Sequence, residues 1–323
     1  MTHAIRIHET GGPEVLRWDE VEVGAPGPGE ARVRHAAIGL NFIDTYHRSG
    51  LYPLPLPAVI GSEGAGTVVS VGPGVTEVAP GDRVAYAGVV GAYAGERLIP
   101  AGRLVPLPEG VDERLAAASM LKGMTAQYLL RRTHRLEAGE TILLHSAAGG
   151  VGLLAAQWAK SLGATVIGTV STDEKAALAR EAGCDHVVVT SREDFVARVK
   201  EITGGAGVRV VYDAVGKDTF RGSLDCLAPL GLMVTYGNAS GPVEPVPPLL
   251  LSQKGSLFLT RPTLMAYTAK REDLLATAAD LFTVLLRGTV KVRIGAELPL
   301  REAAAAHEAL EGRRTTGSTL LLP

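Results

Sequence analysis

The chain has 323 residues, more than one domain usually holds, so two domains with buried cores are predicted. Its 32 basic and 34 acidic residues give a formal net charge of −2 with no run of like charge, which argues against a nucleic-acid partner. The sequence shows neither a secretory leader pattern nor an apolar stretch of the roughly 18 residues that span a bilayer, so no membrane association is expected.

The two cysteines, Cys184 and Cys226, lie far apart in the chain. This excludes a disulfide-rich scaffold and a cysteine-rich zinc lobe, and it is typical of a protein of the reducing cytoplasm. We therefore expect a cytoplasmic location.

Short strand-like segments dominate the first 120 residues, and glycines and prolines separate them. Examples are "RVRHAAIG" at 32–39, "GTVVSVGPGV" at 66–75 and "GDRVAYAG" at 81–88. β-branched runs between such turn residues predict a β-rich, partly open barrel with antiparallel strands.

From about Glu140, apolar strands alternate with helices. Strands are predicted at 141–147, 164–170, 186–190, 208–215, 232–237 and 256–262, and helices at 151–162, 173–183, 193–202 and 219–227. Continuous apolar strands between helices indicate a parallel sheet covered on both faces, so this part is an α/β, doubly wound Rossmann domain.

After Pro262 the pattern changes to two helices, at 271–288 and 301–312, and a closing strand at 318–323. This tail is not another strand–helix–strand unit, so we expect it to complete the first domain. The predicted domains are a discontinuous β-rich one, residues 1–124 and 263–323, and an inserted Rossmann domain, residues 125–262.

The glycine turn "AAGGVG", residues 147–152, lies between a predicted strand and a predicted helix. It matches the dinucleotide-binding fingerprint with alanine at the first glycine position. Gly149 lets the backbone approach a pyrophosphate, and the unpaired amides of the helix start supply an anion site. A plain tight turn is the alternative, but the strand before and the helix after favour a dinucleotide site.

The end of the second strand indicates which dinucleotide binds. NAD enzymes usually carry an acidic residue about 20 residues beyond the glycine turn. Here Ser171 and Thr172 stand near that position, and Lys175 follows. Hydroxyl and ammonium groups attract a 2′-phosphate that a carboxylate would repel, so NADPH is favoured over NADH. Asp173 could instead bind the ribose, although it is better placed to start a helix.

Several motifs together carry a family resemblance: "NFIDTYHRSGLYP" at 41–53, "GSEGAG" at 61–66, "LKGMTAQYLL" at 121–130, the glycine turn, "VRVVYDAVG" at 208–216 and "RRTTGSTLLLP" at 313–323. With these motifs the chain resembles the zinc-independent NADPH:quinone oxidoreductases, the zeta-crystallin-like members of the medium-chain dehydrogenase/reductase superfamily. The resemblance implies a GroES-like catalytic domain and a Rossmann domain, with NADPH in the cleft between them.

Zinc alcohol dehydrogenases of that superfamily carry metal ligands that this chain replaces. Their "GHE" is "GSE" here, with Ser62 for the histidine, while Asn41 and Lys122 lie near the positions of the first and last ligands. Amide, hydroxyl and ammonium groups do not substitute for thiolate and imidazole, so no catalytic metal is expected.

Without a metal to polarise it, the acceptor must already be electron-poor, as quinones and activated enones are. The resemblance implies that Asn41, Tyr46 and Tyr52 are catalytic, with Asn41 near the nicotinamide ribose or the acceptor and the tyrosines donating to a quinone oxygen. Packing at a domain rim is the alternative for both tyrosines. Asp44 is expected to orient its neighbours.

The resemblance also implies a larger set of cofactor-binding residues. This set is Asn41, Thr125, Gly149, Gly150, Val151, Ser171, Lys175, Tyr236, Gly237, Asn238, Thr260 and Arg313. One position departs from the family: a related bacterial enzyme has a tyrosine after its third strand, where this chain has Thr190 and Ser191. Loss of that aromatic ring is expected to weaken binding on the adenosine side.

The strand at 256–262 is expected at a sheet edge, which invites pairing with a second subunit and, with the family habit, predicts a homodimer. Two other functions stay open for the chain. One is reduction of enones or enals with NADPH, and the other is dinucleotide binding with little turnover.

Overall fold

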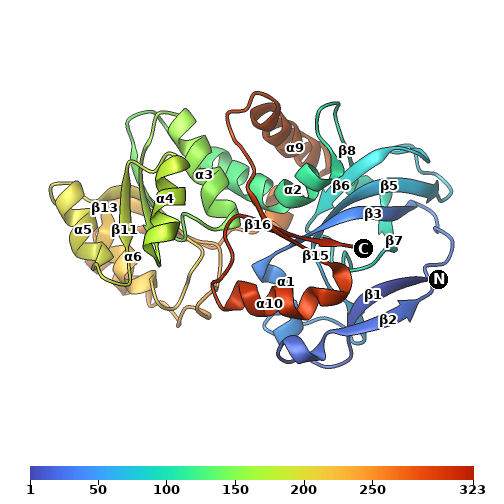
Figure 1. Cartoon of the computed structure of the whole chain (residues 1–323). Helices are drawn as coiled ribbons and strands as arrows, with labels where there is room; N and C mark the ends of the chain where they lie inside the picture. Colours follow the sequence, from blue (N-terminus) through green and yellow to red (C-terminus); the bar gives the residue numbers. More distant parts are fainter. The chain divides into compact units, whose positions relative to one another are not determined.

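The computed structural model describes all 323 residues and contains two compact units (Figure 1). The first comprises Met1–Met124, Tyr267–Leu286 and Val292–Pro323, and the second comprises Thr125–Ala266 and Arg287–Lys291. The first unit therefore contains both ends of the chain. None of the helices is both long and apolar enough to cross a membrane.

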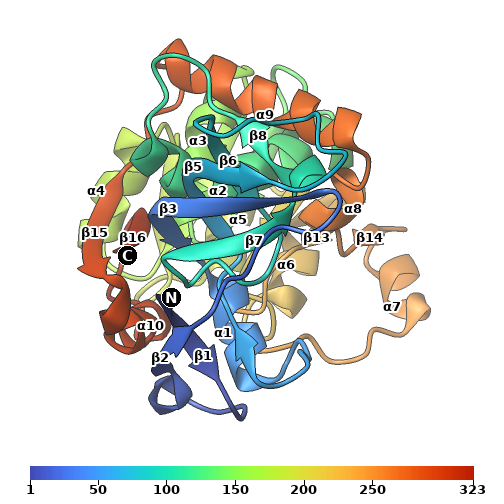
Figure 2. The ribbon, with the colours of Figure 1, turned by 90° about the vertical axis from the view of Figure 1, so that its right-hand side faces the viewer.

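The first unit is built on a seven-stranded sheet with the order β15-β16-β3-β5-β6-β8, and β7 also pairs with β3 (Figure 2). Its strands are β3 (Glu30–Leu40), β5 (Glu63–Val71), β6 (Arg83–Ala87), β7 (Glu96–Pro100), β8 (Val105–Pro106), β15 (Ile294–Pro299) and β16 (Ser318–Leu322). Every pair is antiparallel except β15 with β16. The predicted β-rich, largely antiparallel architecture is confirmed.

A smaller sheet and a few helices complete this unit. The sheet has the order β2-β1-β4, with β1 (Thr2–Ile7), β2 (Arg17–Val21) and β4 (Ala58–Val59). The helices are α1 (Phe42–Ser49), α9 (Arg271–Leu286) and α10 (Ala303–Glu311), and α2 (Glu113–Tyr128) begins here. Strand β15 was not predicted, because it alternates half-buried and exposed residues and buries none completely.

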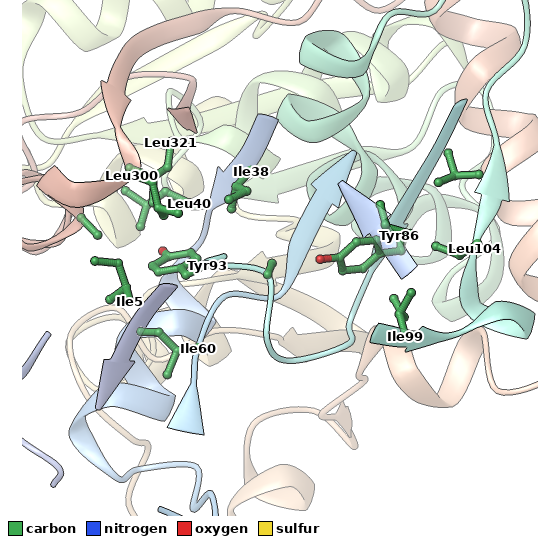
Figure 3. Packing of buried hydrophobic residues seen from close by; sticks show 14 of the residues in the cluster. Ile5, Ile38, Leu40, Ile60, Tyr86, Tyr93, Ile99, Leu104, Leu300 and Leu321 are labelled. Atoms are coloured by element: carbon green, nitrogen blue, oxygen red, sulfur yellow. The ribbon is translucent and has the colours of Figure 1, made fainter. Parts of the chain in front are cut away.

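The core of the first unit joins residues from both ends of the chain (Figure 3). Ile5 and Tyr93 pack near Leu300 and Leu321, which come from the last 24 residues of the sequence. Burial of each such aliphatic side chain stabilises the fold by about 1.5–3 kcal/mol. The C-terminal segment is therefore part of the same core as the N-terminal strand.

The second unit contains a six-stranded, wholly parallel sheet with the order β11-β10-β9-β12-β13-β14. Its strands are β9 (Thr141–Leu144), β10 (Thr165–Val170), β11 (His186–Val189), β12 (Val208–Asp213), β13 (Leu227–Thr235) and β14 (Phe258–Thr260). The strand order reverses between β9 and β12, as it does in Rossmann domains. The predicted parallel sheet is confirmed, and β14 lies at its edge as expected.

Helices alternate with these strands. They are α3 (Gly150–Ser161), α4 (Asp173–Glu181), α5 (Phe195–Ile202), α6 (Phe220–Cys226), α7 (Pro248–Gln253) and α8 (Leu264–Tyr267). Leu143, Ile167 and Val211 on the sheet form one core with Val199 of α5 and Phe220 of α6. Helices α5 and α6 therefore cover one face of the sheet.

Both cysteines lie in this second unit and are buried free thiols. Burial raises the pKa of the Cys184 thiol and that of the Cys226 thiol to about 12. Neither side chain is a thiolate near neutral pH.

Candidate active site and cofactor site

The segment around α1 in the first unit is fixed by two buried carboxylates. Asn41 precedes the helix, and its backbone amide donates a hydrogen bond to Asp44 Oδ2 at 2.9 Å. This is the return half of a capping box, which holds the start of a helix to the chain before it. The Asn41 Nδ2 atom donates to the Gly39 carbonyl at 3.1 Å and to Glu63 Oε2 at 2.8 Å. Both of its amide hydrogens are therefore used within the protein.

Asp44 is wholly buried and receives further hydrogen bonds. Ser62 Oγ donates to Asp44 Oδ1 at 2.8 Å, and the Tyr93 hydroxyl donates to Oδ2 at 3.1 Å. Burial raises the pKa of Asp44 to about 7, although the hydrogen bonds from Ser62, Asn41 and Tyr93 and the charge of Lys122 oppose the shift. The desolvation cost of the charged form outweighs these favourable contacts.

A directed chain of hydrogen bonds continues from Asp44 to the surface. The Tyr93 hydroxyl lies 3.0 Å from His307 Nε2, and Arg48 Nη1 lies 3.0 Å from His307 Nδ1. Arg48 also forms a two-pronged ion pair with Glu311, at 2.8 and 2.9 Å. Because a guanidinium can only donate, His307 Nδ1 accepts, so Nε2 carries the hydrogen that Tyr93 receives. Burial and the Arg48 charge lower the pKa of His307 to about 3, so its ring is neutral.

The second buried carboxylate, Glu63, neutralises a buried lysine. Lys122 Nζ lies 2.9 Å from Glu63 Oε2, and the Leu121 amide donates to Oε1 at 2.6 Å. By the family resemblance, Ser62 replaces a metal-ligating histidine of the zinc dehydrogenases, and Asn41 and Lys122 lie near the positions of the first and last ligands. Their amide, hydroxyl and ammonium groups hold Asp44 and Glu63 instead, and such a donor set does not fit zinc. No group of three or more His, Cys, Asp or Glu side chains in the chain is arranged to hold a metal ion.

The two predicted catalytic tyrosines lie together after Asn41. Tyr46 is on α1, Tyr52 follows it, and their rings make an edge-to-face contact with centroids 5.3 Å apart. The Tyr52 amide donates to the Tyr46 carbonyl at 3.0 Å. The structure therefore brings Asn41, Tyr46 and Tyr52 onto one short segment, and their contact with a substrate stays a prediction.

In the second unit, the glycine turn leads directly into α3. Gly149 is the N-cap residue, and no side chain caps the helix, so no side chain occupies the amides at its start, including those of Gly150 and Val151. A Cβ atom on Gly152 would lie 2.2 Å from the carbonyl oxygen of Ser146, a contact that backbone atoms cannot relieve. Gly152 thus permits close packing, and the helix start presents an anion site.

The end of β10 places the other predicted phosphate ligands beside α4. Ser171 follows the strand, and Thr172 caps the helix by accepting a hydrogen bond from the Lys175 amide at 3.4 Å. Asp173 is the first residue of α4, as predicted, and Lys175 lies in its first turn. Asp173 pairs with Arg192, whose guanidinium lies 2.9 Å away.

The remaining predicted cofactor residues are spread over both units. Tyr236, Gly237 and Asn238 follow β13, and Thr260 ends β14, so all four lie at the carboxyl edge of the parallel sheet. A Cβ atom on Gly237 would lie 2.3 Å from the Ala214 carbonyl oxygen, so only glycine fits there. Thr125 is buried on α2, and Arg313 lies in the first unit, in the loop after α10.

Sequence reasoning assigned no role to several buried polar residues. Asp213, at the end of β12, accepts hydrogen bonds from the Val215 and Gly216 amides and from Thr219 Oγ1. His145 is unexposed between Thr169 Oγ1 and Ser223 Oγ, each 2.9 Å from one ring nitrogen. Asp213 lies in the motif "VRVVYDAVG", where it follows the apolar residues Val210, Val211 and Tyr212. A carboxylate at the end of such a buried strand was the signal that could have indicated its role. The Arg48–His307 contact spans 259 positions and has no local signal.

Two family models match the chain, the alcohol dehydrogenase GroES-like domain at residues 27–109 and the zinc-binding dehydrogenase domain at residues 150–282. The quinone oxidoreductase of Pseudomonas aeruginosa is 56% identical, with all of both chains covered. The chain belongs to the quinone oxidoreductase family of the medium-chain dehydrogenase/reductase superfamily. The 2-haloacrylate reductase of a Burkholderia species is 49% identical over the whole chain and 99% of that protein. The solved structure of Escherichia coli quinone oxidoreductase complexed with NADPH is 50% identical and matches with a TM-score of 0.98, covering 99% of this chain and 100% of that one.

The buried Asp44 predicts a pH dependence of stability. Its folded pKa of about 7 exceeds the ordinary 3.8, so the folded chain binds more protons than the unfolded chain between these values. Stability contributed by this group is complete below about pH 4 and is lost as the pH rises through about 7, by at most about 1.4 kcal/mol per pH unit. The stability of Asp44→Asn relative to that of the wild type should therefore rise between about pH 4 and pH 7, the range over which the wild type loses this contribution. Urea unfolding at several pH values measures this, with the exposed Glu244→Gln as control. Parallel profiles for Asp44→Asn and wild type would contradict the assignment.

Proposed function

We propose that the chain reduces quinones with NADPH and uses no catalytic metal. The observation that carries this proposal is the full-length identity of 50–56% with quinone oxidoreductases, one of them solved complexed with NADPH. The anion site at the start of α3 and the replacement of the zinc ligands by Asn41, Ser62 and Lys122 support it. We place the cofactor on the domain of residues 125–262 and the catalytic residues on the domain of residues 1–124 and 263–323.

The chain offers groups for each part of the cofactor. Gly150 and Val151 supply backbone amides for the pyrophosphate, and Gly149, whose own amide donates to the Ser146 carbonyl, lets the backbone approach it. Ser171 and Lys175 supply a hydroxyl and an ammonium for the 2′-phosphate. Other proposed contacts come from Thr125, Tyr236, Gly237, Asn238, Thr260 and Arg313. The bound cofactor supplies a hydride, which is the difficult chemistry of the reaction.

The residues of the first unit then orient the acceptor. Tyr46 and Tyr52 carry hydroxyls that can donate to an acceptor oxygen as negative charge develops on it. Asn41 and Asp44 hold the segment that carries both tyrosines. The reduced acceptor takes its proton from water, so the mechanism requires no buried general acid.

Reduction of activated alkenes is the second candidate function, and the 49% identical 2-haloacrylate reductase favours it. Both reactions use an electron-poor acceptor and the same hydride source.

Oxidation of NADPH by a panel of acceptors, followed as the loss of nicotinamide absorbance, distinguishes quinone reduction from alkene reduction. We expect the protein to oxidise NADPH faster with benzoquinones and naphthoquinones than with 2-chloroacrylate or simple enones. Faster turnover of the alkenes would make alkene reduction the main activity. Binding of NADPH without oxidation by any acceptor would support a binding protein with little turnover.

Lys175→Ala tests the 2′-phosphate contact. Loss of a charge-assisted hydrogen bond should weaken NADPH binding about tenfold or more and leave NADH binding nearly unchanged. Fluorescence titration of the bound nicotinamide measures both dissociation constants. Lys200→Ala, in the last turn of α5, is the matched control. Equal losses for NADPH and NADH would remove the proposed role.

We also propose that the protein is cytoplasmic and that it forms a homodimer through the edge strand β14. Phe258 on this strand is 60% exposed, and Leu230 and Leu249 of the same unit are 55% and 65% exposed. An unpaired strand edge that carries an exposed apolar side chain is a surface that a second copy can cover.

Phe258→Lys should shift the protein from dimer to monomer, because it places a charge in the proposed apolar contact. Light scattering at micromolar concentration measures the mass. Leu275→Lys on α9, where the leucine is 36% exposed, should stay dimeric. A monomeric wild-type protein would count against the dimer itself.

A further inference from the structure

Arg192 is held in a short turn directly after β11. The backbone amides of Arg192 and Glu193 both donate to the Val189 carbonyl, at 3.1 and 3.0 Å, and Glu193 Oε1 accepts from the Val189 amide at 3.0 Å. The turn is also bound to the neighbouring strand β10. The amide and the hydroxyl of Thr190 both donate to the carbonyl of Val170, the last residue of β10. The backbone of Arg192 is therefore fixed at the carboxyl ends of β10 and β11.

From this point Arg192 reaches the first turn of α4. Its Nη2 atom lies 2.9 Å from Asp173 Oδ1, and its Nε atom lies 3.9 Å from Glu193 Oε1. Asp173 is two residues from Ser171 and two from Lys175 along the chain. The guanidinium is thereby brought to the helix start that carries both proposed 2′-phosphate ligands.

The ion pair between Arg192 and Asp173 is exposed, with 58% and 69% of the two side chains accessible. Pairs of this kind stabilise a fold by only about 0–1 kcal/mol, so exchanging one partner costs little. A phosphate group carries up to two negative charges and strong acceptor oxygens, and a guanidinium fork matches it better than it matches one exposed carboxylate. A phosphate near α4 can therefore replace Asp173 as the ion-pair partner of Arg192.

The pair also affects the choice between the two cofactors. An acidic residue near this position usually binds the ribose hydroxyls of NADH and repels a 2′-phosphate. Here the charge of Asp173 is balanced by Arg192. The acidic residue that would otherwise favour NADH is thus occupied by a cation.

We propose that Arg192 is a ligand of the cofactor 2′-phosphate and that Asp173 holds its guanidinium when no phosphate is bound. This inference rests on the proposed function and adds a specificity-determining residue to it.

Binding measurements that need no turnover test this proposal. Calorimetry with NADPH, NADH, 2′,5′-ADP and 5′-AMP reports the contribution of the 2′-phosphate in each variant. Arg192→Ala should weaken NADPH and 2′,5′-ADP about tenfold without weakening NADH or 5′-AMP, and the freed Asp173 should if anything favour NADH. Arg192→Lys keeps the charge but loses the forked geometry of the guanidinium, so its affinity for NADPH should lie between that of the wild type and that of Arg192→Ala. Asp173→Asn should tighten NADPH binding severalfold, because the competing carboxylate is gone.

Arg198→Ala is the matched control, since Arg198 is also exposed and lies 3.9 Å from Glu193. It should leave the preference for NADPH unchanged. If Lys175→Ala weakens NADPH but Arg192→Ala does not, the role of Arg192 is wrong and the proposed function stands. If Arg192→Ala weakens NADPH and NADH equally, its assignment to the 2′-phosphate is wrong. If Asp173→Asn fails to tighten NADPH binding, Asp173 does not compete with the 2′-phosphate for Arg192. If wild type binds NADPH no better than NADH and Lys175→Ala changes neither, the proposed cofactor itself is wrong.

Discussion

Two buried carboxylates, Asp44 and Glu63, organise the segment that carries the proposed catalytic tyrosines. Neither is exposed to solvent, and each receives three hydrogen bonds from neutral or cationic donors. Asn41 binds both of them, one through its backbone and one through its side chain. Removing one partner of a buried charged group commonly costs about 3–5 kcal/mol, so the segment depends on the complete set.

The nucleotide-binding unit is built on a different principle. Gly149 and Gly152 form a turn with the backbone alone, and the helix amides there need no side chain to present positive charge. We propose that discrimination between related cofactors depends on two side chains at the next strand ends, the half-buried Lys175 and the exposed Arg192. The proposed pyrophosphate site is thus made of backbone, whereas the exposed Arg192 proposed to select the cofactor can be exchanged at small cost in stability.

Local patterns predicted the parallel sheet, the glycine turn and the helix start at Asp173, because each depends on residues near one another in the sequence. Strand β15 escaped prediction because it buries no residue completely. The link from Asp44 through Tyr93 to His307 also escaped, since it joins three distant segments. Thr190 was interpreted as the loss of a contact. The sequence alone did not indicate that Arg192, two residues later, bridges to α4.

The buried thiols matter for a protein proposed to handle quinones. Quinones are electrophiles that arylate thiolates by conjugate addition. Cys184 and Cys226 are 5% and 0% exposed, and burial raises both thiol pKa values to about 12. Since the thiolate is the reacting form, both side chains are screened by access and by protonation. In the folded protein neither cysteine therefore offers a reactive thiolate to acceptors of this class.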